Sequence, residues 1–96
     1  MRRHGRVDAN HAEIVRALRQ VGASVQSLAD IGKGCPDLLV GFRGDTFLLE
    51  IKDGSKPPSA RVLTPDEGAW LACWRGSPYH VVSSVDEALE AICGGK

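Results

Sequence analysis

Two apolar segments in the middle of the chain, separated by a tight-turn signal, constrain the fold more than any other feature. Residues 37–43 (DLLVGFR) and 46–52 (TFLLEIK) are short and rich in Leu, Val, Ile and Phe, which is typical of β-strands. Gly44-Asp45 between them predicts a two-residue hairpin turn with glycine first. Alternation along this hairpin predicts one buried face made of Leu38, Val40, Phe42, Phe47, Leu49 and Ile51.

Helical and strand patterns flank this hairpin on both sides. Ile14, Leu18 and Val21 have the spacing of one helix face, and Asp8 or Asn10 can cap that helix. Helices are expected over residues 9–21, 64–76 and 85–93, and further strands over 24–28 and 79–83. The predicted order α-β-β-β-α-β-α gives a mixed α/β (α+β) sheet with helices packed on it.

The second helix has the clearest start signal. Thr64 is a favoured cap, Pro65 suits the first helical position, and Glu67 completes a capping box. Trp70 and Trp74 lie four residues apart on this helix, and their spacing favours core or dimer packing over a stacking platform for bases.

Composition limits the classes of protein to consider. A chain of 96 residues with 43% hydrophobic and 25% charged residues predicts one folded domain over residues 1–96, with residues 1–7 as a flexible basic arm. The 12 basic and 12 acidic residues give zero net charge, which argues against a binder that depends on phosphate contacts alone. Three scattered cysteines predict neither disulfides nor a zinc site. We expect a cytoplasmic protein with no membrane segment and no organic cofactor.

Charged residues interrupt the apolar pattern at the open end of the hairpin. With Gly44-Asp45 as the turn, Asp37 is expected to face Lys52 across the pair. Because strand side chains alternate, Glu50 lies on the same face as Lys52, diagonal to Asp37. The sequence therefore predicts that two carboxylates and one ammonium converge on one side of the sheet.

Such a group suits a hard divalent cation, because magnesium takes oxygen ligands and keeps waters that a phosphate can replace. A lysine beside the cation can orient or help deprotonate an attacking water. The alternative is a cross-strand ion pair at a sheet edge. Burial of the strand around Glu50 favours the functional interpretation, because unpaired charge in a core strand is costly.

The spacing of these residues resembles the PD-(D/E)xK nuclease superfamily. Pro36-Asp37, twelve further residues and then Glu50-Ile51-Lys52 match that signature, and the element order is similar to its αβββαβ core. The chain is most similar to small stand-alone nucleases of the VRR-NUC type from phage and bacteria. Holliday-junction resolvases belong to the same superfamily.

The resemblance implies a role for each matching residue. Asp37 and Glu50 would be metal ligands together with the Ile51 backbone carbonyl, and Lys52 would position the attacking water. Glu13 matches a glutamate that the family often places on the first helix. Glu67 stands nearest to a glutamine found in relatives, but the capping box explains it without catalysis, so it is not counted among the site residues.

The resemblance further implies Mg²⁺ as the cofactor, with Mn²⁺ as a substitute, and DNA as the substrate. We expect a structure-specific or non-specific endonuclease, acting as a homodimer. Lys33, Lys56 and Arg61 are candidates for phosphate contacts. A non-catalytic nucleic-acid-binding module of the same fold, or an interaction protein with merely paired charges, are the alternatives.

Overall fold

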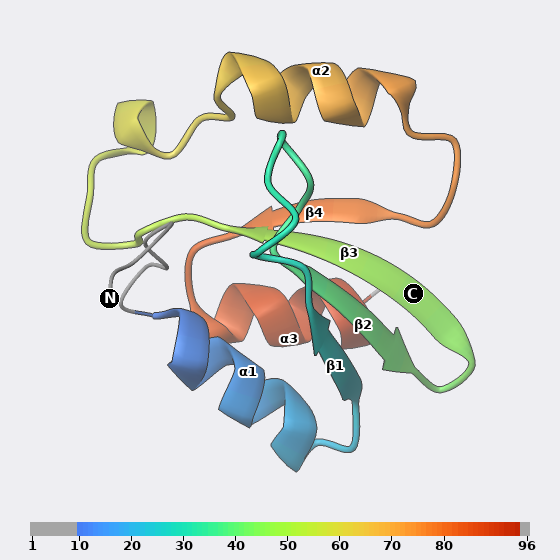
Figure 1. Cartoon of the computed structure of the whole chain (residues 1–96). Coiled ribbons are helices and arrows are strands. Elements are labelled where there is room, and N and C mark those ends of the chain that lie inside the picture. The colour runs from blue at the N-terminus through green and yellow to red at the C-terminus, as the bar shows by residue number, and fades with distance from the viewer. Residues whose placement is uncertain (1–9, 95–96) are drawn as a thin grey trace.

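The computed structural model describes residues 10–94 and has the predicted order of elements (Figure 1). The expected basic arm at residues 1–7 and the Asp8 cap lie outside these residues. The mixed α+β class is confirmed. The elements are α1 (His11–Gln20), β1 (Ser24–Ser27), β2 (Leu38–Phe42), β3 (Asp45–Ile51), the 3-10 turn η1 (Pro58–Ala60), α2 (Pro65–Cys73), β4 (Tyr79–Val82) and α3 (Val85–Cys93).

The four strands form one sheet in the order β1-β2-β3-β4. The first three are antiparallel, whereas β4 runs parallel to β3. A parallel pair needs a long crossover connection, and η1 and α2 supply it. As a result α2 lies over one face of the sheet, while α1 and α3 pack together on the other (Figure 1).

The hairpin between β2 and β3 differs from the predicted register. Arg43 and Gly44 form the turn, and Phe42 pairs with Asp45. Both turn residues have positive φ, 54° and 87°, as the type I′ turn requires, whereas a turn with glycine first is a type II′ turn. The predicted opposition of Asp37 and Lys52 is therefore wrong. Continuing the observed pairs by one position places Asp37 opposite Glu50.

This correction moves each partner by two positions and so leaves the faces unchanged, because side chains alternate with a period of two. The predicted apolar face is confirmed as part of the core shared with Ile14 and Leu18 of α1. Phe47 is only partly buried but packs against it. The buried members from the hairpin are Leu38, Val40, Phe42, Leu49 and Ile51.

The start of α1 is anchored to the sheet rather than capped by its own side chain. Asn10 occupies the N-cap position, but it makes no side-chain cap bond. Its amide Nδ2 instead donates to the carbonyl oxygens of Lys52 and Ser83, at 3.1 and 2.9 Å. The side chain therefore ties α1 to the ends of β3 and β4, which a local sequence rule for caps does not anticipate.

Among residues 10–94, no helix has both the length and the apolar character needed to cross a bilayer.

Candidate functional site

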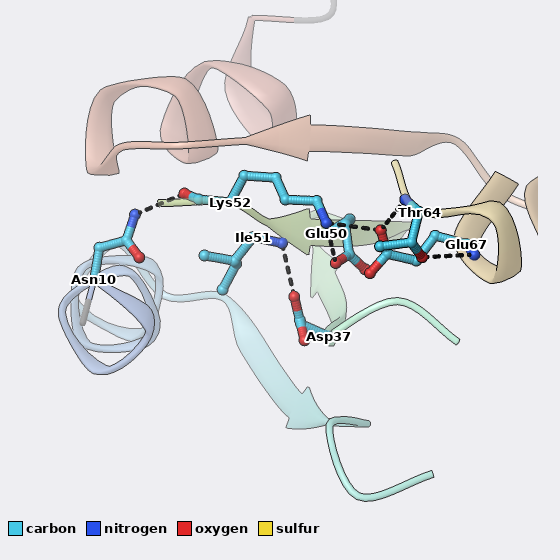
Figure 2. A network of polar contacts seen from close by, with 7 residues as sticks. All are labelled: Asn10, Asp37, Glu50, Ile51, Lys52, Thr64 and Glu67. Carbon is cyan, nitrogen blue, oxygen red and sulfur yellow. Dashed lines mark hydrogen bonds and ion pairs between the residues drawn. The ribbon is translucent and has the colours of Figure 1, made fainter. Parts of the chain in front are cut away.

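Asp37 is held firmly at the entrance to β2. The preceding Pro36 is fully buried, and the backbone carbonyl of Asp37 accepts a hydrogen bond of 2.7 Å from the N–H of Leu28. Its carboxylate oxygen Oδ2 accepts from the N–H of Ile51 at 2.8 Å (Figure 2). The carboxylate of Asp37 thus reaches across to β3, between the positions of Glu50 and Lys52.

Glu50 is the one charged residue in the buried set of the described chain, with 4% of its surface exposed. Burial, and then the charge of Asp37, raises the pKa of this carboxyl from 4.5 to about 9. Its oxygen Oε1 is buried and has no hydrogen-bond partner. Because buried polar atoms are normally satisfied, this oxygen has the character of a ligand position.

Lys52 joins the same group from the end of β3. Its Nζ lies 2.7 Å from Oε1 of Glu67 and 3.7 Å from Oε2 of Glu50 (Figure 2). Burial opposes the charged form of Lys52, but the hydrogen bond and charge of Glu67 outweigh it, and the pKa of the lysine is raised. Lys52 is therefore a fixed cation beside Glu50.

Glu67 is the residue of this group that the sequence analysis set aside. The capping box is present, with Glu67 N–H donating to the Thr64 hydroxyl and Glu67 Oε1 accepting from the Thr64 N–H. The same Oε1 also accepts from Lys52. Burial opposes ionisation of Glu67, but the hydrogen bonds from Lys52 and the Thr64 N–H, with the charge of Lys52, together outweigh it and lower the pKa of Glu67. The sequence feature that could have identified Glu67 as a site residue was its position on the helix that follows Lys52.

Tyr79 also borders the site, and nothing in the sequence pattern marked it. Tyr79 is the first residue of β4 and pairs with Leu48 of β3. Because Leu48 and Glu50 are two residues apart on β3, the Tyr79 side chain shares the face of Glu50. The hydroxyl is buried without a hydrogen-bond partner. Burial, followed by the charges of Glu50 and Glu67, raises its pKa. Cys35 lies nearby as well, and burial with the charges of Glu50 and Asp37 raises the pKa of its thiol.

Glu13 is placed differently from the expectation. It is exposed on α1 and lines a hollow with Asn10, Asp53 and Asp86, beyond the end of β3. In the described part of the chain, no three His, Cys, Asp or Glu side chains are grouped so as to hold a metal ion. The structure therefore brings Asp37 and Glu50 together without Glu13.

The three cations proposed as phosphate contacts lie in loops. Lys33 and Lys56 are exposed. Arg61 donates to the carbonyl oxygens of Lys56 and Gly54, at 2.7 and 2.9 Å, so it braces the loop that follows β3.

Asp37 and Glu50 fit a divalent cation. They supply two carboxylates, and magnesium sites in proteins commonly use one or two carboxylates with water completing the shell. The unpartnered Oε1 and the raised pKa of Glu50 both indicate a buried carboxylate whose charge the nearby Lys52 does not fully offset. The Ile51 N–H holds Asp37 from the protein side, as an orienting group would.

Comparison with known proteins bears on the fold. The structure is similar to a solved VRR_NUC domain, with a TM-score of 0.64 and 24% sequence identity, covering 91% of this chain and 98% of that one. The sequence matches no family model and no curated protein. The chain therefore has the fold of a VRR_NUC domain, which confirms the fold that the sequence resemblance implied.

Proposed function

We propose that this protein is a divalent-metal-dependent nuclease that hydrolyses phosphodiester bonds in DNA. The observation that carries the proposal is the Asp37–Glu50 pair with Lys52 beside it, on a fold similar to a VRR_NUC domain. The alternative of a purely structural ion pair does not explain the burial of Glu50, because one of its buried oxygens has no hydrogen-bond partner.

In this proposal Asp37 and Glu50 hold Mg²⁺ or Mn²⁺, and the backbone carbonyl of Ile51 is a third candidate ligand. A cation bound there would polarise a phosphoryl oxygen and lower the pKa of a bound water. The protein holds both carboxylates in position for the cation: the Ile51 N–H orients Asp37, and Glu50 is fixed within a buried strand.

Lys52 serves as a cation next to the scissile phosphate. Its raised pKa keeps it protonated at neutral pH, so it stabilises negative charge and orients the attacking water rather than removing a proton. Glu67 positions the ammonium through the 2.7 Å contact. Attack by water forms a new bond from oxygen to phosphorus and breaks the bond from phosphorus to the leaving oxygen. Solvent water takes up the proton that the attacking water loses and supplies the proton that the leaving oxygen gains.

The substrate class follows from the size and charge of the chain. A chain of 96 residues with zero net charge offers little surface for reading a long sequence, so we propose structure-specific or non-specific cutting. A homodimer would place two sites on two strands. Sedimentation of the purified protein tests whether it is a homodimer. A monomer at the concentration used for cleavage would contradict that part of the proposal.

The central test is cleavage of plasmid DNA by the purified protein with Mg²⁺, with Mn²⁺ and with EDTA. We expect cleavage that EDTA abolishes, and a loss of about 100-fold or more in Lys52→Ala. Arg75→Ala removes the same charge away from the site and should cleave as the wild type does. Cleavage that survives EDTA, or undiminished cleavage by Lys52→Ala, would refute the proposal.

Binding of the metal is tested separately by calorimetry, without any substrate. Asp37→Asn and Glu50→Gln should each weaken Mn²⁺ binding, whereas Lys52→Ala should keep it. If the wild type binds metal and DNA but cuts neither plasmid nor branched DNA, the protein is a binding module of this fold instead.

A further inference from the structure

The hollow between α1 and β1 is lined by two arginines and a histidine, and the candidate site does not use it. It has a volume of about 650 Å³, and its polar lining comes from His11, Arg16, Arg19, Gln20 and Ser27. No aspartate or glutamate belongs to its described lining. Two other hollows carry carboxylates, Glu87 and Glu90 in one and Glu13, Asp53 and Asp86 in the other.

The two arginines in this hollow are available for an anion. The ion pairs found among residues 10–94 involve Lys52, so no carboxylate of that part of the chain neutralises Arg16 or Arg19. Arg19 donates a hydrogen bond of 3.1 Å from Nη2 to the Val25 carbonyl oxygen, and its side chain remains exposed. Arg16 lies one helical turn earlier and is exposed.

The other described arginines lie outside this hollow. Arg61 braces the loop after β3, and Arg75 donates to carbonyl oxygens at the end of its own helix. Arg43 covers the Phe42 ring at the hairpin turn, at the end of β2 opposite to Asp37.

One end of the hollow lies close to the candidate site along the chain. β1 turns back along α1, so the Ser27 end of the strand lies level with the start of the helix (Figure 1). Ser27 pairs with Leu38, and the next residue, Leu28, donates its N–H to the Asp37 carbonyl. Asn10, just before α1, binds the Lys52 carbonyl. This end of the hollow is thus joined to Asp37 by a backbone hydrogen bond from Leu28, and to Lys52 by the side-chain amide of Asn10.

The distance suits a continuous strand of nucleic acid. Neighbouring strands of a sheet are about 4.8 Å apart, so β1 lies roughly 10 Å from β3, which carries Glu50. Phosphates of one DNA strand follow each other about every 3.4 Å along the helix axis, so about three phosphates cover that distance. This spacing is measured across the sheet. The hollow opens on the α1 face, because Ser27 pairs with the core residue Leu38, whereas Glu50 faces α2. The DNA strand would therefore pass around the β1 edge of the sheet, and Arg16 and Arg19 would meet its backbone several nucleotides from the cut.

We propose that the α1–β1 hollow binds the phosphate backbone of the DNA substrate several nucleotides from the scissile bond, with Arg16 and Arg19 as its phosphate contacts. This inference rests on the proposed function for its substrate class. The apolar stems of Ala12 and Val15 in the same hollow offer a surface for the sugar edge.

The test compares two double variants that remove the same charge. Arg16→Ala/Arg19→Ala changes the hollow, whereas Arg43→Ala/Arg75→Ala changes cations distant from it. Binding of a short fluorescein-labelled DNA duplex is followed by anisotropy over a salt series, with Ca²⁺ present so that binding is measured without cleavage. Circular dichroism melts of each protein verify the fold.

We expect Arg16→Ala/Arg19→Ala to bind at least about 10-fold more weakly and to lower the slope of log K against log salt by about 2, one unit for each lost phosphate contact. The matched control should keep the wild-type slope. Equal losses in both variants, or an unchanged slope in the first, overturn the inference.

The outcomes also separate this inference from the proposed function. If the wild type binds DNA with this arginine dependence but does not cut it, the hollow is a DNA-binding surface and the nuclease assignment fails. If the wild type cuts and Arg16→Ala/Arg19→Ala binds and cuts as well as the control, the hollow plays no part and the nuclease assignment stands.

Discussion

The two faces of the sheet are built for different purposes. The face under α1 and α3 contains the apolar core, in which Leu38, Val40 and Leu49 are completely buried. The face under α2 carries Glu50, Lys52 and Tyr79, and α2 itself buries no residue. Trp70 and Trp74 of α2 stack on each other, with ring centroids 4.9 Å apart, instead of entering the core as one alternative expected.

The core face therefore supplies most of the folding stability, whereas the face under α2 carries the candidate site. A helix packed on a core gains most of its stability from burial, whereas α2 depends on its cap and on a few contacts at its ends. One such contact is at Gly34, where an added Cβ would clash with the Asp66 carbonyl oxygen at the start of α2. The β1–β2 loop therefore approaches α2 closely where Glu67 enters the site.

The largest expected effect is on the core face. Leu49→Ala should lower the free energy of unfolding by about 2–5 kcal/mol, because it leaves a cavity at a completely buried position. Leu39→Ala on the other face, where 37% of the side chain is exposed, should cost about 1 kcal/mol or less. Urea denaturation measures both. Similar losses would contradict the division between the two faces.

The next effect is a pH dependence from the site face. With no metal bound, the unfolded Glu50 loses its proton near the ordinary pKa of 4.5, but the folded residue keeps it to about 9. The folded state holds more protons in that window, so stability falls as pH rises, by up to about 1.4 kcal/mol per unit. Glu50→Gln should remove this slope and be more stable than the wild type at pH 8.

Glu67→Gln is the control for this measurement, because its shift has the opposite sign. The pKa of Glu67 is lowered on folding, so the stability it contributes is present above its unfolded pKa and is lost as pH falls. Glu67→Gln should therefore be less stable than the wild type at neutral pH. Denaturation midpoints of the three proteins, measured in EDTA across the pH range, test both expectations. If the midpoints of the wild type and Glu50→Gln depend on pH in the same way, Glu50 is not the source of the pH dependence.

The smallest effect compares the two capped helices. Thr64 and Ser84 each accept a bond from the N–H of the third helical residue, at 3.3 and 3.1 Å. Ser84→Ala should cost about 1 kcal/mol of global stability, because α3 is part of the core. Thr64→Ala should cost less globally, since α2 can fray by itself, but it should increase amide exchange in α2.

Thr64→Ala also loosens Glu67 and with it the position of Lys52, so plasmid cleavage should fall in this variant and not in Ser84→Ala. Hydrogen exchange by mass spectrometry and the cleavage assay test the pair together. Equal protection of α2 and α3 in the wild type would contradict the distinction.

Much of the architecture could be predicted because local patterns carried it. Alternation along β2 and β3 identified the core face, and Thr64-Pro65-Asp66-Glu67 identified the start of α2, with its capping box confirmed. The order of elements and the VRR_NUC-type fold followed from the same signals together with the spacing from Asp37 to Glu50.

The register could not be predicted because both candidate pairings bury the same apolar face. A shift of each partner by two positions changes no inward residue, so hydrophobic pattern cannot distinguish them. The choice depended on the turn, which places Arg43 at positive φ, and on the bond from the Ile51 N–H to Asp37.

The sequence by itself determined that Asp37, Glu50 and Lys52 share one face, because side-chain alternation is a local property of a strand. Only the tertiary structure decided which residues meet them from other elements. It placed Glu67 on Lys52, set the Tyr79 hydroxyl on the Glu50 face, and left Glu13 beside Asp53 instead. These contacts depend on how a crossover helix, a parallel strand and α1 are packed, and no local spacing in the chain encodes that packing.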